Sequence, residues 1–241
     1  MIEHLPNLQR HLGLWLLPLT DAADARLERG LDRLTADERD RYDAYTNVTR
    51  QREFALCRLL LRTVLERCGY DALSRTPLID GPHGKPLFNT REALQFNLSH
   101  AQGMAVLVLG GHTPVGIDIE PAARTLPSTL LAPRYCHDNE LQWLAPHIQD
   151  TASHQRHFLQ LWVRKEAVLK ARGDGVHGGP RRVDAVSKPD VAVYHTALDG
   201  TPEEWRVVDI DAHADYIVAV ASEPGSPKPV VTLLDGPGAV I

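Results

Sequence analysis

Two carboxylates stand two residues apart in an otherwise apolar run, Val115 to Glu120, which reads VGIDIE. Alternation along a β-strand sends Asp118 and Glu120 to the same face, roughly 6.6 Å apart at about 3.3 Å per residue. Like charges at that separation repel, so this face must meet open water, a basic partner or a metal ion. The run therefore predicts a buried strand that ends at a charged site.

A third carboxylate lies in the helical segment HFLQLWVRKEAVLKARGDG. Trp162, Glu166 and Lys170 fall at i, i+4 and i+8, so they share one face of this helix. Alone, Glu166 and Lys170 could be an exposed ion pair worth about 0.3–0.5 kcal/mol. Together with the strand acids, Glu166 completes a set of oxygen ligands that suits Mg²⁺ or Mn²⁺ better than Zn²⁺. Magnesium held in this way commonly acts on a phosphate or pyrophosphate.

A phosphate ligand needs cations and hydrogen-bond donors, and three short motifs offer them. The motif HGKP carries Lys85 on a loop framed by Gly and Pro, NLSH carries Ser99 and His100, and RQR carries Arg50 and Arg52. Each motif also has an ordinary structural explanation, as a solvated loop lysine, a turn hydroxyl or surface charge. It is their combination with the three acids that favours a phosphate-binding site.

The elements that must position these motifs fall into two halves. Arg50 to Cys68 shows helical periodicity, Ile79 to Phe88 is dense in Gly and Pro and predicts a loop, and apolar strands follow. The order of helix, loop and strands then recurs, which hints at a duplication. We therefore predict an N-terminal half at residues 1–112, a C-terminal half at 113–222 and a loosely held Pro/Gly-rich tail at 223–241.

The composition is that of a soluble globular protein, with 43% apolar and 24% charged residues in 241. A net charge of −5 argues against a nucleic-acid binder. Three cysteines without CxxC spacing argue against a disulfide framework or a zinc site. The apolar run Leu12 to Leu19 is too short to span a bilayer and lacks a basic region before it. We expect a cytoplasmic protein that binds neither membranes nor nucleic acids.

The motifs GKP, FNLSHA, VGIDIE and WVRKEAVLK, in that order, resemble those of the 4′-phosphopantetheinyl transferases, in particular the larger, surfactin-type branch. The resemblance extends from about Arg50 to Gly175. It implies an α/β (α+β) fold, a pseudo-dimer of two similar half-domains, each an antiparallel sheet packed with helices. The active site is expected in the cleft between the halves, and the protein is expected to be a monomer because one chain supplies both.

The resemblance also implies a reaction, the Mg²⁺-dependent transfer of 4′-phosphopantetheine from coenzyme A to a serine of an apo acyl or peptidyl carrier protein, which releases 3′,5′-ADP. It makes Asp118, Glu120 and Glu166 the metal ligands, with Mn²⁺ as a possible substitute. Glu166 is expected to act as general base and Lys170 to stabilise the leaving group. Residues after the metal strand, among them Arg124, Leu130 and Arg134, are expected to dock the carrier.

Coenzyme A phosphates are expected, on the same resemblance, to contact a set of cationic and hydroxyl side chains. Lys165 and Lys170 should face the pyrophosphate, and Arg50 and Arg52 the 3′-phosphate. Arg58 is a further match, but its apolar neighbours predict an internal ion pair. The expected coenzyme A contacts besides Lys170 are Arg50, Arg52, Lys85, Ser99, His100 and Lys165.

Two other functions compete with this one. A hydrolase with Ser99 as nucleophile and His100 as base is disfavoured, because adjacent residues of a strand point to opposite faces and no G-x-S-x-G motif is present. A non-catalytic homologue that only binds a carrier protein or coenzyme A should have lost acids or the lysine first. All three acids and Lys170 are present in this chain.

Overall fold

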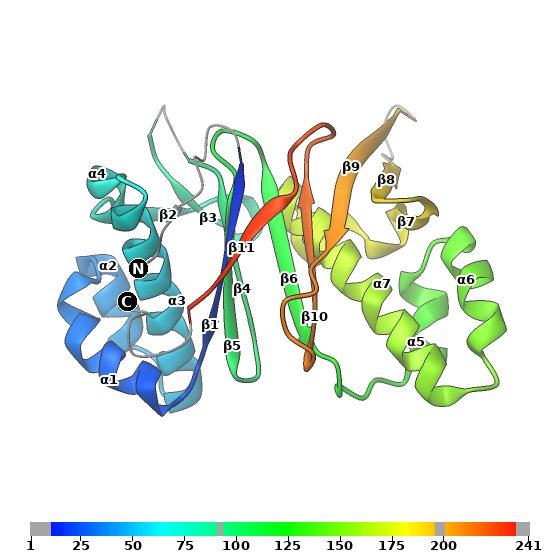
Figure 1. Ribbon diagram of the computed structural model, residues 1–241, viewed down its shortest axis with the longest axis horizontal. Coiled ribbons are helices and arrows are strands. Elements are labelled where there is room, and N and C mark those ends of the chain that lie inside the picture. The colour runs from blue at the N-terminus through cyan, green and yellow to red at the C-terminus, as the bar shows by residue number, and fades with distance from the viewer. Residues whose placement is uncertain (1–10, 91–93, 196–200, 235–241) are drawn as a thin grey trace.

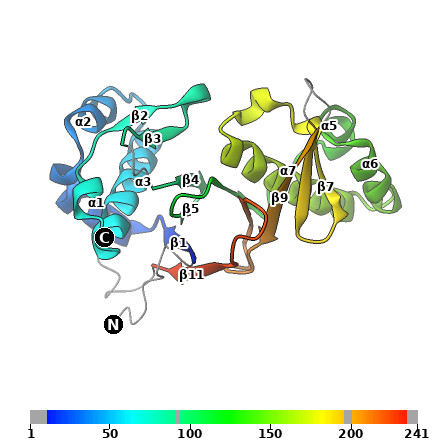
Figure 2. The same ribbon diagram turned by 90° about the horizontal axis from the view of Figure 1, so that it is seen from above.

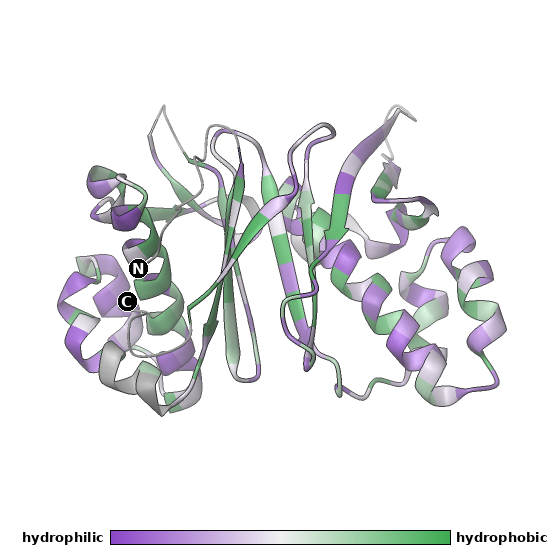
Figure 3. Cartoon of the chain, viewed as in Figure 1, coloured by the Kyte–Doolittle hydropathy of each residue, from purple (hydrophilic) through white to green (hydrophobic). Residues whose placement is uncertain are grey.

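The computed structural model describes residues 11–90, 94–195 and 201–234 (Figure 1). Two sheets stand face to face at the centre, and the helices lie on the two outer sides (Figures 1 and 2). Figure 3 shows that apolar residues concentrate in the central strands, whereas the outer helices carry many hydrophilic ones. Among the described residues, no helix combines the length and the apolar character needed to cross a membrane.

The first half pairs a group of helices with one sheet and one short hairpin. Its helices are α1 (Asp21–Gly30), α2 (Ala36–Asp43), α3 (Val48–Arg67) and α4 (Asp71–Ser74). Its strands are β1 (Leu12–Pro18), β2 (Leu78–Asp80), β3 (Pro86–Phe88), β4 (Phe96–Ala101) and β5 (Met104–Leu109). The β2–β3 hairpin corresponds to the segment predicted as a loop, because its strands are only three residues long and a Gly-rich turn joins them.

The second half has its own sheet and a longer central helix. Its helices are α5 (Ser128–Tyr135), α6 (Asp138–Leu144) and α7 (Thr151–Arg172). Its strands are β6 (Val115–Pro121), β7 (Val183–Lys188), β8 (Val191–His195), β9 (Pro202–Asp209) and β10 (Tyr216–Ser222). The strands run in the order β6-β10-β9-β8-β7, and every neighbouring pair in this sheet is antiparallel.

The two halves repeat one plan. Each begins with a strand, continues through helices to a long helix and ends in antiparallel strands. The order β1-β5-β4 in the first sheet matches the order β6-β10-β9 in the second, with the initial strand in the same place. The predicted fold class, two similar α/β halves that form a pseudo-dimer, is confirmed by this arrangement.

Apolar side chains form three cores, one for each half and one at their junction. The first packs α3 against the first sheet, and the second packs α7 against the second sheet. The third fills the space between the two sheets. Its members from the strands that open each half are Leu12, Leu14, Leu16, Val115, Ile117 and Ile119. Because this third core is apolar throughout, the sheets are held together by hydrophobic burial.

The Pro/Gly-rich tail is a correction to the sequence prediction. Residues 229–233 form β11 (Pro229–Leu233), which pairs in parallel with β1 of the first sheet. The Leu234 amide then donates to the Leu16 carbonyl at 2.8 Å. Local composition concealed this strand, because its stability comes from pairing with a strand about two hundred residues earlier. Residues 235–241 lie outside the described residues.

A glycine fixes how closely α7 approaches β6. A Cβ added at Gly116 would lie 2.1 Å from the Ala167 carbonyl oxygen and 2.3 Å from the Ala171 amide nitrogen. Both atoms belong to the helix backbone, so no side chain can rotate to make room. Any larger residue at this position must push the helix away from the strand.

We expect Gly116→Ala to lower the free energy of unfolding by about 3 kcal/mol, as measured by urea denaturation. Gly225→Ala is the matched control, because its added Cβ meets nothing within 4 Å and only its positive φ of 84° is strained. That control should cost about 1 kcal/mol. Equal losses in the two variants would contradict the close approach of α7 to β6.

Candidate active site

Strand β6 sends its acids toward α7, as its alternation predicts. Ile117 and Ile119 are buried in the core between the sheets. Asp118 and Glu120 occupy the alternate positions, on the side of Gly116 and α7, with Asp118 buried and Glu120 half-buried. The two strand acids therefore lie at the seam between the strand and the long helix.

Helix α7 brings the third acid and a lysine to the same seam. It begins at the Asp150 cap, whose carboxylate accepts hydrogen bonds from the Ala152 and Ser153 amides, and it ends at Gly173 in a left-handed conformation. Glu166 and Lys170 lie one turn apart on the side that meets β6. This arrangement confirms that the helix presents both residues to the strand acids.

A short network joins three elements at the site. The Lys170 ammonium donates to Asp118 Oδ1 at 2.6 Å and to Ser99 Oγ at 2.8 Å. The Ser99 hydroxyl lies 3.1 Å from the same carboxylate oxygen and donates to it. Strand β4 contributes Ser99, so the first half participates directly in a site whose acids come from the second half.

The positive charges next to the three carboxylates are too few to balance them. Burial raises the pKa of Glu166 to about 7, and the nearby Asp118 and Glu120 carboxylates raise it further against the opposing effect of Lys170. Burial also raises the pKa of Glu120, and the nearby Arg124 guanidinium partly offsets this rise. Asp118 Oδ2 and Glu166 Oε1 are buried without a hydrogen-bond partner. Buried carboxylate oxygens without donors fit the coordination of a hard divalent cation.

A second group of potential metal ligands is less suitable. His137, Asp184 and His195 offer ligand atoms within 4.8 Å of one another. The two imidazole rings are stacked, however, with 10° between their planes and 4.9 Å between their centroids. Ring lone pairs lie in the ring planes, so stacked rings are poorly placed to share one ion, and Asp184 already accepts four hydrogen bonds. We therefore place the candidate metal site at the carboxylates.

A cationic cavity of about 390 Å³ lies in the first half, between α3 and the strands β3 and β4. Arg50 and His100, which the sequence singled out, both line it, as do Arg41 and Arg58. Glu53 also lines the cavity, and its carboxylate lies 3.6 Å from His100 Nδ1. An excess of guanidinium groups over acids makes this cavity suitable for an anion.

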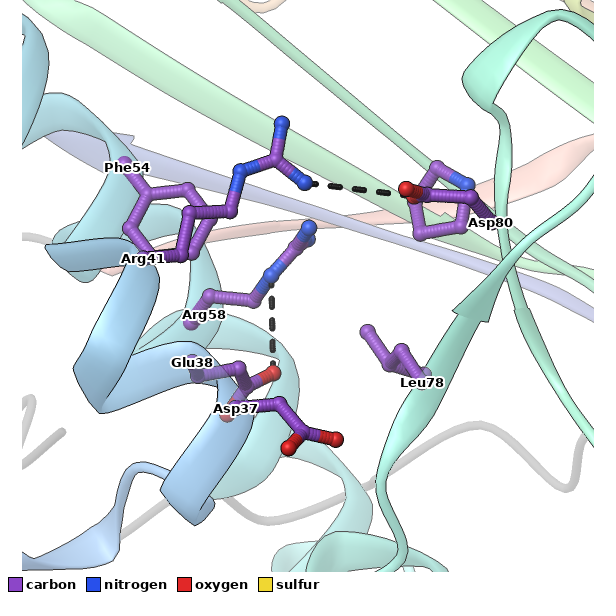
Figure 4. A pocket seen from close by; sticks show the side chains of 8 residues that line it. Asp37, Glu38, Arg41, Phe54, Arg58, Leu78 and Asp80 are labelled. Atoms are coloured by element: carbon purple, nitrogen blue, oxygen red, sulfur yellow. Dashed lines mark ion pairs between the residues drawn. The ribbon is translucent and has the colours of Figure 1, made fainter. Parts of the chain in front are cut away.

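A smaller cavity of about 230 Å³ adjoins it and shares Arg41 and Arg58 (Figure 4). Both guanidinium groups lie over the Phe54 ring, 5.3 Å and 5.0 Å from its centroid. Arg58 pairs with Glu38 at 3.4 Å, so the predicted internal ion pair is present. Arg58 nevertheless faces both cavities. The sequence did not predict Arg41 as a phosphate contact, because nothing in its polar helix distinguishes it from a surface charge.

Three of the expected phosphate contacts are held elsewhere. Lys165 is fully buried, pairs with Glu140 and donates to the Val183 carbonyl at 2.5 Å, so its expected contact with a pyrophosphate is wrong. Lys165 directly precedes Glu166, so its side chain lies about 100° away around the helix and faces α6 and β7. Arg52 donates to backbone carbonyls of Leu19 and Thr20 at 3.0 and 3.1 Å, outside the cationic cavity. Lys85 donates to three backbone carbonyls.

Strand β4 serves two regions with its alternating side chains. Ser99 faces the acids, whereas His100 faces the cationic cavity. Their opposite directions argue against a Ser99–His100 hydrolase dyad. Asn97, on the same side as Ser99, accepts a hydrogen bond from the Ile117 amide at 2.9 Å and so ties β4 to the acid-bearing strand. The motif NLSH contains Asn97, but its spacing alone does not reveal this partner.

Comparison with known proteins relates this site to one family. Residues 114–221 match the family model described as the 4′-phosphopantetheinyl transferase superfamily. The chain is 29% identical over 223 residues to the 4′-phosphopantetheinyl transferase HetI of Nostoc sp., and the match covers 90% of each chain. It is 35% identical over 95 residues to the 4′-phosphopantetheinyl transferase gsp of Aneurinibacillus migulanus, which covers 39% of this chain and 37% of that one. The nearly complete match to HetI indicates two chains of similar length.

The raised pKa of Glu166 predicts how pH affects the metal-free protein. Folded Glu166 keeps its proton up to about pH 7, whereas the unfolded residue loses it near 4.5. The folded state then binds more protons in this window, so stability falls as pH rises through it. Relative to Glu166→Gln, the free energy of unfolding of the wild type in EDTA should fall by at most about 3 kcal/mol between these pH values. A difference that stays constant with pH would contradict the buried position of Glu166.

Proposed function

We propose that this chain, which belongs to the 4′-phosphopantetheinyl transferase superfamily, transfers 4′-phosphopantetheine from coenzyme A to a serine of an apo acyl or peptidyl carrier protein. The observation that carries the proposal is the pair of buried, unpartnered oxygens on Asp118 and Glu166, next to the Lys170 ammonium. Such a site combines metal ligands with a cation for phosphate chemistry. The nearly complete match to HetI supports assignment to the larger branch of the superfamily.

The carboxylates of Asp118, Glu120 and Glu166 would hold Mg²⁺, or Mn²⁺ in its place. Their hard oxygen donors, their mutual repulsion and the two unpartnered oxygens support this assignment. When bound, the ion would neutralise charge on the pyrophosphate and so favour attack at phosphorus. Glu120 is paired with Arg124, and we propose that it exchanges this partner for the ion.

Coenzyme A would extend from the cationic cavity to the acids. Arg50 and His100, together with Arg41 and Arg58, would hold the 3′-phosphate end, because all four line the same cavity. Ser99 and Lys170 would meet the pyrophosphate, because their polar atoms surround Asp118 Oδ1 at the edge of the metal site. Strand β4 joins the two regions through the adjacent residues Ser99 and His100.

The reaction requires one proton to move and one P–O bond to break. The carrier serine oxygen attacks the phosphorus on the pantetheine side, and the bond from that phosphorus to the 3′,5′-ADP oxygen breaks. Glu166 accepts the hydroxyl proton, directly or through a water, because its carboxylate has a buried oxygen without a hydrogen-bond partner next to Asp118. The Lys170 ammonium balances the charge that develops on the leaving phosphate.

The carrier is proposed to dock on α5, just beyond the acid-bearing strand. Leu130 exposes 72% of its surface there, and Arg134 is exposed nearby. An apolar anchor beside a cation suits the acidic helix that surrounds the target serine of carrier proteins. We further propose that the chain works as a monomer, because one chain supplies both halves of the cleft. We also propose that it works in the cytoplasm.

The proposed function is tested by mass spectrometry of an apo carrier protein incubated with this protein and coenzyme A. A gain equal to one phosphopantetheine group, present with Mg²⁺ and absent with EDTA, is the expected result. No gain with fatty-acid, polyketide and nonribosomal-peptide carriers would overturn the proposal. If carrier or coenzyme A still bound, that outcome would favour the non-catalytic homologue.

Removing one carboxylate charge from the metal site should nearly abolish transfer. We expect Asp118→Asn to lower kcat/KM at least about a hundredfold, because the metal ion that neutralises charge on the pyrophosphate would lose a buried carboxylate ligand. Glu204→Gln is the matched control, since Glu204 is an exposed acid paired with Lys188 on the second sheet. Transfer rates measured by carrier mass should be unchanged in the control. Equal activity of both variants would exclude Asp118 from the site.

Charge reversal on α5 should weaken carrier docking alone. We expect Arg134→Glu to raise KM for the carrier about tenfold, or about 1.4 kcal/mol, and to leave KM for coenzyme A unchanged. Arg75→Glu is the control, because Arg75 is exposed in the first half, at the end of α4. An unchanged carrier KM in Arg134→Glu would remove α5 from the docking surface.

A further inference from the structure

The Lys85 ammonium lies against the end of α7. Its Nζ donates to the Lys170 carbonyl at 2.7 Å, to the Ala171 carbonyl at 3.2 Å and to the Val115 carbonyl at 3.2 Å. An ammonium group has three N–H donors, and these three acceptors use all of them. Lys85 therefore has no donor left for a phosphate while it keeps these contacts.

These contacts complete the C-terminal cap of α7. The last four carbonyls of a helix lack partners within the helix. The Leu169 carbonyl accepts from the Gly173 and Asp174 amides, whereas the Lys170 and Ala171 carbonyls accept from Lys85. A cation at this end also interacts favourably with the negative end of the helix dipole. Lys85 is thus a helix cap supplied by a distant part of the chain.

The β2–β3 hairpin is shaped to deliver this lysine. The Gly81 amide donates to the Lys85 carbonyl at 2.8 Å, and the Gly84 amide donates to the Gly81 carbonyl at 3.0 Å. Gly84 and His83 both have positive φ angles, 78° and 57°, which tighten the turn. The His83 ring also lies 5.3 Å from the His177 ring, just beyond α7. The hairpin of the first half therefore closes on the helix of the second.

The third acceptor links this cap to the acids. Val115 opens β6, three residues before Asp118, and Lys170 carries the ammonium that bonds to Asp118. One Lys85 side chain therefore holds the start of the acid-bearing strand and the end of the acid-bearing helix together. Burial lowers the pKa of Lys85 to about 8, as expected for an ammonium enclosed by backbone.

We propose that Lys85 is a positioning residue, which holds the end of α7 against β6 so that Lys170 and Glu166 stay aligned with Asp118. This inference rests on the proposed function. It differs from the role expected for the GKP motif, in which Lys85 contacts a coenzyme A phosphate. The two roles make opposite predictions for kinetics, because a phosphate contact acts on coenzyme A binding and a positioning contact acts on the chemical step.

Steady-state kinetics of Lys85→Met separate the two roles. With saturating carrier and Mg²⁺, we expect kcat to fall at least about tenfold, since small misplacements of catalytic groups are costly. KM for coenzyme A should change less than about twofold. Lys188→Met is the matched control, because Lys188 is an exposed lysine on β7 that pairs with Glu204 on the second sheet. A raised KM with unchanged kcat would overturn the positioning role.

A measurement on the wild type covers the case in which the variant does not fold. Lysines labelled with ¹³C next to the amine report the pKa of Lys85 by NMR, with and without coenzyme A. We expect this pKa to be unchanged by coenzyme A. A rise would overturn the inference, because a phosphate next to the ammonium stabilises its charged form. The NMR result tests the role of Lys85 whether or not any carrier is modified. A lack of carrier modification would instead refute the proposed function.

Discussion

Three carboxylates at one seam, two of them buried and one half-buried, are the constraint on which the rest of the structure depends. Each costs free energy to remove from water, and each raises the cost for the others. The Lys170 ammonium offsets part of this charge at Asp118, and Arg124 offsets part at Glu120. Neither reaches the unpartnered oxygen of Glu166. A fold that keeps these acids together must therefore fix α7 and β6 rigidly, and the molecule does so in several ways.

The seam is fixed from both halves of the molecule. Within the second half, Gly116 lets the helix backbone approach the strand directly. From the first half, Asn97 bonds to the Ile117 amide and Lys85 bonds to the end of α7. Apolar burial between the two sheets holds these contacts in register. The two similar halves thus contribute differently, since one carries the acids and the other carries the cationic cavity and the contacts that hold the seam.

The sequence predicted those features that depend on local periodicity. Alternation placed Asp118 and Glu120 on one face, and helical spacing placed Glu166 and Lys170 on another, because both periods are set by the backbone. Lys165 shows where this reasoning stops. Its position next to Glu166 was evident, but its buried partner Glu140 comes from a different helix. The partners of Lys85 and β11 were hidden for the same reason, since both contacts join segments far apart in the chain.

The most direct test of the account is anomalous diffraction from crystals soaked in Mn²⁺. The account predicts a manganese peak between the carboxylates of Asp118, Glu120 and Glu166, with the buried oxygens of Asp118 and Glu166 turned to it. Crystals of the Glu166→Gln variant, soaked in the same way, should show a weaker manganese peak or none. Manganese bound elsewhere, with Lys170 still the only cation at Asp118, would contradict the claim that these acids form a metal site.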